Sequence, residues 1–211
     1  MSLSIKQIDN YIQALTENAR SLHKESELLF KKKAFARSYT LSHIAREEIA
    51  KCHILYAAGR RVIAGIDVDW KQTMKRLRDH KAKLRQEAVS HAGMCMIDGN
   101  EKAFDLNMRA AQPSADLRND YKNNSLYVGI SSDGNILKPN HVIEKDRAQS
   151  NIELARYAIA DEVNFQSKVG KLSKMDPSKL VDISNVDSMT EEEHREALRR
   201  LSQAIGKGDL P

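Results

Sequence analysis

Arg37 and His43 are the first pair of side chains in the chain that could do chemistry on a phosphate ester. A histidine can act as general acid or base, and an arginine can stabilise the negative charge that develops on phosphate. Two residues six apart on one helix point about 120° away from each other, so this pair converges only near a helix start or across a dimer. The alternative is that both side chains serve surface or packing roles.

His43, Glu47 and Lys51 follow one another at intervals of four, which places them on one stripe of a helix. A histidine with carboxylates could bind a divalent metal, and His80 could add a nitrogen from a neighbouring helix. A diiron site normally carries Glu-x-x-His on two helices, and neither Glu47 nor Glu48 has a histidine three residues later. We therefore expect no metal or other cofactor, and interpret the stripe as a series of salt bridges.

Glu48 and Lys81 are charged residues within apolar stripes. When residues 34–58 are projected as a helix, Glu48 lies among apolar side chains. Lys81 has the same kind of position on the next helix, with His80 at its edge. A carboxylate that faces a core needs a cation or hydrogen-bond donors. We expect Glu48 to pair with Lys81, either within a functional site or as a salt bridge that fixes helix register.

Arg118, Lys122 and Tyr127 form a fourth candidate group, which leads into an extended stretch. Two cations and a tyrosine could contact phosphate and stack on a base. The alternative is that Tyr127 anchors the extended stretch to the rest of the protein. Glycine-rich phosphate loops, HExxH, CxxC and GxSxG are absent from the sequence, which excludes the common nucleotide-binding, zinc and hydrolase motifs.

Helices must position these residues, because apolar side chains recur at helical spacing over most of the chain. The expected helices cover residues 4–33, 34–60, 69–90, 101–123 with an interruption at Pro113, 140–172, and a short segment that begins at Thr190. Residues 126–138 read as a small extended hairpin. The predicted fold class is all-α with this hairpin as an insertion. Residues 1–172 form the bundle, and residues 173–211 form a connector and a C-terminal helix that packs on the same domain.

The composition is typical of a soluble helical protein, with 211 residues, 41% apolar, 30% charged and 5% aromatic. Two cysteines, Cys52 and Cys95, are too few for a disulfide framework and predict reduced thiols in a cytoplasmic protein. We find neither a signal-peptide pattern nor an apolar run that could span a membrane. A net charge of +5, with basic residues clustered in 71–85, is a weak sign of nucleic-acid binding; the alternative is a solvated helix face.

Several motifs, taken in order, resemble the AbiV family of abortive infection proteins, a branch of the HEPN superfamily. The resemblance rests on Ala45–Lys51, Trp70, Asp79–Lys81, Lys122–Val128 and, after Pro139, Asp146–Ala148. Together these motifs cover roughly residues 10–165. The resemblance implies a HEPN-like bundle of about five helices, usually dimeric, with a role in antiviral defence of bacteria against phage.

The resemblance also implies an activity. Many HEPN proteins are metal-independent ribonucleases in which Arg-x(4–6)-His motifs of two protomers meet at the dimer interface. The RNA 2′-hydroxyl attacks its adjacent phosphate, with the histidine as acid/base and the arginine stabilising charge. In the superfamily this motif lies near the start of a late helix, whereas Arg37 and His43 lie in the second. Arg118 begins a similar motif, but Asn123 stands where the histidine would be.

The leading hypothesis is an antiphage abortive-infection effector that acts on RNA or on the translation machinery. As a metal-independent endoribonuclease it would use His43 or His80 as acid/base and Arg37 or Arg118 on phosphate. Residues that would support or bind are Glu47, Glu48, Lys51, Lys81, Lys122 and Tyr127. One alternative is a non-catalytic module that blocks translation or senses a phage protein, and another is a metalloenzyme. The expected partners are RNA or the ribosome, a second copy of the chain and a phage-encoded activator, with no membrane.

Overall fold

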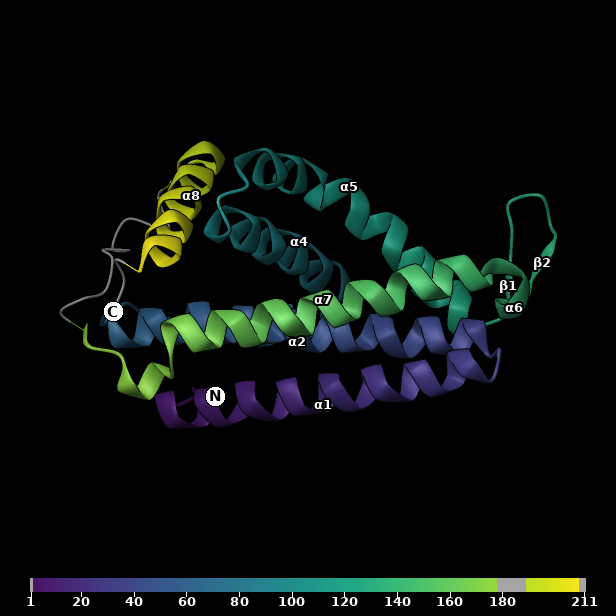
Figure 1. The fold of residues 1–211 in the computed structure, drawn as a ribbon, viewed down its shortest axis with the longest axis horizontal. Helices are drawn as coiled ribbons and strands as arrows, with labels where there is room; N and C mark the ends of the chain where they lie inside the picture. Colours follow the sequence, from purple (N-terminus) through teal and green to yellow (C-terminus); the bar gives the residue numbers. More distant parts are fainter. Residues whose placement is uncertain (1, 178–188, 209–211) are drawn as a thin grey trace.

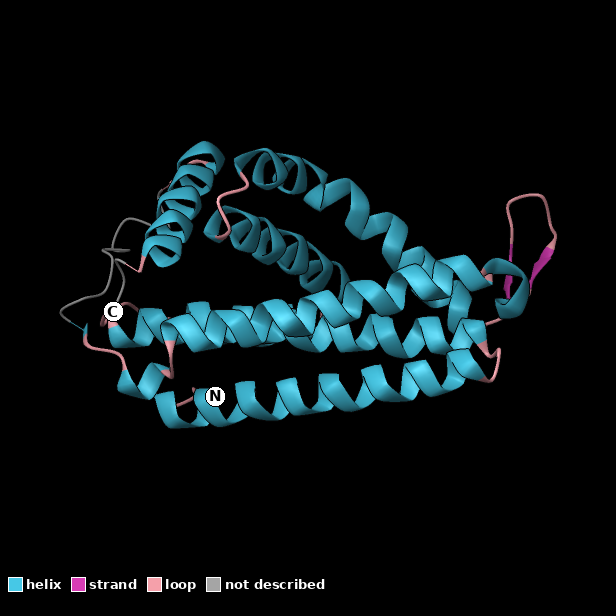
Figure 2. Ribbon diagram, viewed as in Figure 1, coloured by secondary structure: helices cyan, strands magenta, loops and turns pink. Residues whose placement is uncertain are grey.

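The computed structural model describes residues 2–177 and 189–208, and these residues are almost entirely helical (Figures 1 and 2). The elements in chain order are α1 (Ile5–Lys31), α2 (Phe35–Ile63), α3 (Trp70–Arg78), α4 (His80–Ile97), α5 (Glu101–Leu126), β1 (Gly129–Ile130), β2 (Ile136–Leu137), α6 (Pro139–Val142), α7 (Lys145–Val169), the 3-10 turn η1 (Leu172–Lys174) and α8 (Glu191–Lys207). The all-α class with a small extended hairpin is confirmed.

Helix α2 is the centre of the bundle. It packs against α1 and α7 on one side and against α4 and α5 on the other (Figure 1). Helix α1 begins with a capping box between Ser4 and Gln7, and its apolar stripe, which includes Ile8 and Leu15, is buried against α2. Because α2 is covered from several directions, even its charged residues Arg46 and Glu47 are buried. A polar interior is therefore built into the middle of the fold.

Asp79 divides the expected helix 69–90 into α3 and α4, so the prediction of one continuous helix was wrong. Asp79 has an extended conformation, with φ −78° and ψ 117°, and its side chain accepts a hydrogen bond from the backbone N–H of Ala82 at 3.0 Å. It therefore ends α3 and caps α4. The break changes which residues of α4 face the core: Lys83 is buried, whereas Lys81 is exposed.

Helix α5 runs without interruption through Pro113, so the predicted interruption was also wrong. The helix bends along its length in Figure 1, which is the usual response of a long helix to an internal proline. The hairpin that follows pairs Gly129 with Leu137 and Ile130 with Ile136 in antiparallel register. Figure 2 shows that its turn projects beyond the end of the helical bundle. Tyr127 is 63% exposed, so it does not anchor the hairpin.

Thr190 caps the start of helix α8, as predicted, and forms a capping box with Glu193. The helix packs on α4, and the approach is so close at Gly206 that a Cβ there would overlap the carbonyl oxygen of Ile97. The connector expected at 173–189 lies partly outside the described residues. Within the parts of the chain that are described, no helix is long and apolar enough to cross a membrane.

A buried acid–histidine pair joins α7 to α2. Glu162 Oε2 lies 3.1 Å from His53 Nε2. Burial raises the pKa of Glu162 to about 7 and lowers the pKa of His53 to about 4. Between about pH 4 and pH 7 the carboxyl group is therefore mostly protonated and can donate a hydrogen bond to the neutral imidazole.

Glu162→Gln is expected to gain stability over wild type as pH rises. The unfolded chain releases the Glu162 proton near pH 4.5, whereas the folded chain keeps it to about pH 7. The free energy of unfolding of the wild type therefore falls as pH rises between these two values, and that of the glutamine variant does not. The stability difference should change by up to about 3 kcal/mol between pH 5 and pH 8. Urea denaturation at both pH values measures it, with the exposed Glu153→Gln as the control that should show no such change.

Candidate functional site

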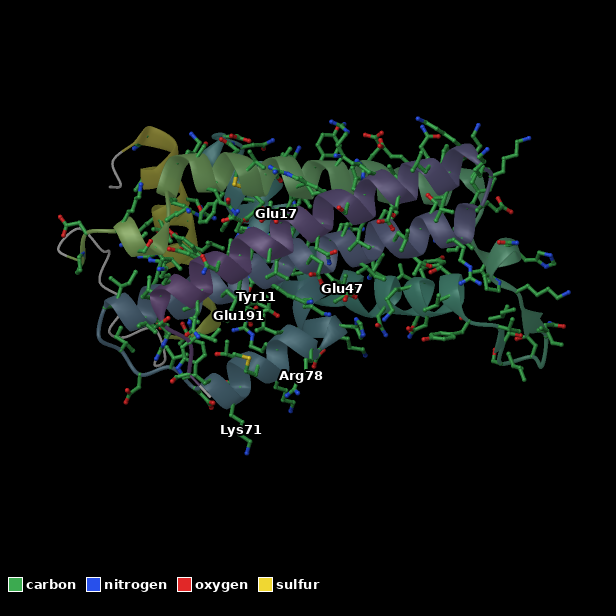
Figure 3. The ribbon with its side chains drawn as sticks, turned by 90° about the horizontal axis from the view of Figure 1, so that it is seen from below. Tyr11, Glu17, Glu47, Lys71, Arg78 and Glu191 are labelled. Atoms are coloured by element: carbon green, nitrogen blue, oxygen red, sulfur yellow. The ribbon has the colours of Figure 1, made fainter. Side chains whose placement is uncertain are left out.

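Glu47 of α2 is the centre of a charged cluster between α2, α4 and α5 (Figure 3). One of its carboxylate oxygens, Oε1, lies 2.7 Å from His80 Nδ1, and the other, Oε2, accepts a hydrogen bond from Lys83 Nζ at 2.6 Å. Burial by itself raises the pKa of Glu47, but its interactions with His43, Lys83 and His80 outweigh this and hold the pKa well below its usual value. The carboxylate is therefore ionised and only accepts hydrogen bonds.

His80 is fixed by this carboxylate yet reaches solvent. Its side chain is 49% exposed, and because Glu47 can only accept, Nδ1 of the ring must donate. The contact orients the ring and leaves Nε2 as the nitrogen that can exchange a proton with a bound group. A carboxylate-oriented histidine at a solvent boundary is an arrangement suited to general acid–base chemistry.

His43 also approaches Glu47 but is fully buried. Its Nε2 is 3.5 Å from Glu47 Oε1, and its ring stacks on Tyr39 with 6.0 Å between centroids. Burial lowers the pKa of His43, so the ring is neutral near pH 7. A side chain without solvent access cannot meet a substrate directly, and His43 therefore packs behind the site.

Glu87 of α4 is the second carboxylate of the cluster, and it joins two arginines. Its Oε1 accepts from Arg46 Nε at 2.6 Å, and its Oε2 accepts from an Arg118 guanidinium nitrogen at 2.8 Å. Burial raises the pKa of Glu87, but the two guanidinium groups reverse this and lower it below its usual value. Asn151 of α7 supports Arg46 by accepting a hydrogen bond at 2.5 Å, so α2, α4, α5 and α7 all contribute.

The cluster carries more positive than negative charge. Its charged members are Arg46, Lys83, Arg118, Lys122, Glu47 and Glu87, which leaves an excess of two positive charges before any histidine is protonated. Burial lowers the pKa of Lys122, even though the nearby Glu47 opposes this shift. Such an excess in a partly buried setting favours binding of an anion, such as a phosphate group.

Helical spacing explains how these residues meet. On α4, His80, Lys83 and Glu87 recur three and four residues apart, so they share one face. On α5, Arg118 and Lys122 are four apart, and they meet the α4 face along the α4–α5 contact. The site is therefore a group of charged side chains along two packed helices, facing α2.

Arg37 and His43 do not come together. Arg37 is exposed in the first turns of α2, whereas His43 is buried beside Glu47. The geometric reason is the one that the spacing indicated, since six residues along a helix turn the side chains apart. Within this chain the two residues therefore do not form a joint site, and their convergence across a dimer stays a prediction.

Glu48 is buried, as its position in the stripe predicted, but it faces α1 instead of α4. Its carboxylate accepts hydrogen bonds from Lys51 Nζ at 2.5 Å and from Asn18 Nδ2 at 3.3 Å. Lys81 is exposed, so it is not the buried cation that was expected. The buried pair between α2 and α4 is instead Glu47 with Lys83.

Sequence reasoning missed four members of the cluster, namely Arg46, Lys83, Glu87 and Asn151. One signal for Lys83 was present, because Asp79 has the residue type of a helix N-cap and a helix that starts there has a different apolar face. Nothing local marked Asn151, whose role depends on the packing of α7 against α2. Among the described residues, no group of three or more His, Cys, Asp or Glu side chains is placed to hold a metal ion.

One comparison with known proteins covers the whole of this site. A family model named HEPN_AbiV, and described as AbiV, matches residues 7–160. The match extends from α1 into α7 and includes every residue of the Glu47 and Glu87 cluster. Neither the curated proteins nor the solved structures contain a match.

Proposed function

The chain belongs to the AbiV family of HEPN-type abortive-infection proteins, and on that premise we propose that it acts on RNA as a metal-independent endoribonuclease. The observation that carries the proposal is the half-exposed His80, oriented by Glu47 beside an excess of cations. This is an acid–base group next to a place that favours phosphate. In the cell, cleavage of RNA would stop translation and growth of the infected bacterium.

In this mechanism His80 removes the proton from an RNA 2′-hydroxyl. The resulting oxygen attacks the adjacent phosphorus, and the bond to the 5′-oxygen breaks, with a proton returned to the leaving oxygen. Arg118, which is partly exposed, and Lys122 stabilise the charge on the non-bridging phosphate oxygens. Glu47 keeps the imidazole in the required orientation. The products are a 2′,3′-cyclic phosphate and a 5′-hydroxyl.

A second candidate function is a binding module that blocks translation without cleaving RNA. The observation in its favour is that Arg37 is exposed whereas His43 is buried. The superfamily's Arg-x(4–6)-His pairing is therefore not formed within this chain. A basic surface on α3, formed by Lys71, Lys75 and Arg78, could carry such binding, and Figure 3 shows Lys71 and Arg78 pointing away from the bundle. We further propose that the protein acts in the cytoplasm, where RNA and ribosomes are found. We also propose that it forms a homodimer, as its family resemblance implies.

The two functions differ in a test with purified protein and total bacterial RNA in EDTA. The ribonuclease proposal predicts discrete fragments that carry 2′,3′-cyclic phosphate and 5′-hydroxyl ends. RNA that stays intact would overturn it. The binding module instead predicts growth arrest that survives His80→Ala but is lost when Lys75 and Arg78 are both changed to glutamate.

A further inference from the structure

A cavity of about 530 Å³ lies between α2, α4, α5 and α7, next to the charged cluster. Its floor is formed by Arg46, Glu87 and Arg118, so the second half of the cluster opens into it. Tyr157 and Asp161 of α7 also line it. The described mechanism uses the cluster from the His80 side and leaves this cavity without a role.

The walls of the cavity combine apolar surface with hydrogen-bonding groups. Ile49 and Leu154 contribute apolar surface from α2 and α7. Asp161 Oδ2 contacts His91 at 3.2 Å, and Asn107 uses its amide N–H to donate to the carbonyl oxygen of Ala103 at 2.8 Å, which keeps its amide oxygen as an acceptor. An apolar interior with a few placed polar groups is the usual composition of a small-ligand site.

We propose that this cavity binds one unstacked nucleotide of single-stranded RNA. The inference deepens the proposed action on RNA and rests on it, because it names where the substrate is recognised. Glu87 lies seven residues beyond His80 on α4, about 10 Å along the helix, and Arg118 contacts Glu87 from α5. A nucleotide in the cavity would thus neighbour the phosphate that His80 acts on.

Tyr157 supplies the stacking surface for the base. Its side chain is 52% exposed, and the guanidinium of Arg156 lies over one ring face, 4.4 Å from the centroid. A base can stack on an aromatic ring whatever its identity, since every base has a π-face. Asp161, as a carboxylate, can accept hydrogen bonds from amino or imino groups of a base, and Arg118 can reach the attached phosphate.

The charged floor favours a nucleotide over an apolar helix from another protein. Arg46 is buried, Glu87 is only 12% exposed and Arg118 only 25% exposed. An apolar helix pressed onto this floor would remove the remaining water without offering new partners, which is costly for charged groups. A nucleotide offers a phosphate to the arginines and a flat apolar base to the walls, so it matches both parts of the cavity.

The test is isothermal titration of the full chain with each of the four ribonucleoside 5′-monophosphates. Tyr157→Ala is expected to weaken binding by about 5- to 150-fold, the range that loss of one base–aromatic stack produces. Tyr157→Phe keeps the ring and should bind like wild type. Tyr11→Ala removes a tyrosine from α1, which does not line the cavity, and should also leave binding unchanged (Figure 3).

The result that overturns the inference is nucleotide binding that does not respond to Tyr157→Ala, or no binding by the wild type. A dimer interface that covers Tyr157 in solution would overturn it as well. Failure here is distinguishable from failure of the ribonuclease proposal, because titration needs no cleavage. Nucleotide binding without RNA cleavage would keep the cavity assignment and remove the catalytic one, and cleavage without nucleotide binding would do the reverse.

Discussion

His80→Ala is expected to slow RNA cleavage by about 10²- to 10⁴-fold, which is the usual contribution of a general acid–base group. His80 is the histidine of the cluster whose imidazole is both held by Glu47 and exposed to solvent. Its removal also takes one hydrogen bond from Glu47, but Lys83 still pairs with that carboxylate. The variant should therefore stay folded while it loses activity.

Initial cleavage rates of a defined RNA in EDTA measure this effect. His194→Ala is the matched control, since His194 is an exposed histidine on α8, outside the charged cluster. A circular dichroism melt of each variant separates loss of catalysis from loss of fold. If His80→Ala cleaves at the wild-type rate, His80 is not the acid–base group, and the proposed mechanism is wrong.

Glu47→Ala is expected to lower the free energy of unfolding by about 3–5 kcal/mol, because it leaves Lys83 buried without its carboxylate. The pKa of Glu47 is depressed in the folded state, so the stabilisation it provides is present above its unfolded pKa of about 4.5. It is lost as pH falls below that value. The difference between variant and wild type should therefore be large at pH 7 and shrink in acid.

Urea denaturation at pH 7 measures this difference, and Glu48→Ala is the matched control. Glu48 pairs with Lys51, which can reach solvent, so its removal should cost only about 1 kcal/mol. The double change Glu47→Leu with Lys83→Met removes both charges and should be far less harmful than Glu47→Ala alone. Equal losses for Glu47→Ala and Glu48→Ala would mean that Glu47 does not hold the buried centre together.

Most of the fold could be predicted, because long amphipathic helices are recognised by apolar residues that recur at helical spacing. The stripe from Ile8 to Leu15 in α1 and the N-cap at Thr190 are examples in which local sequence and final structure agree. Pro113 is the opposite case. Its local preference favours a break, yet the packing of α5 against α4 is enough to keep the helix continuous.

The candidate site was predicted in outline but not in its pairing. The periodicity of α2 correctly indicated a carboxylate in a buried position, but Glu47 and Glu48 are adjacent, and only packing decides which one faces α4. Lys83 could not be placed while α3 and α4 were treated as one helix, since the break at Asp79 shifts the helical phase. Arg118 was identified, whereas its partner Glu87 depends on a contact between two helices that spacing alone does not reveal.

The most direct test of the account compares two arginine variants, Arg118→Ala and Arg37→Ala, in cleavage of one defined RNA in EDTA. Arg118 lies in the charged cluster, whereas Arg37 lies on the exposed surface of α2. Arg118→Ala is therefore expected to slow cleavage by about 10²- to 10³-fold, the effect of removing one donor to a developing negative charge. Arg37→Ala should cleave within about twofold of wild type. The reverse result, or equal rates for both variants, would contradict the assignment of the site to the Glu47 and Glu87 cluster.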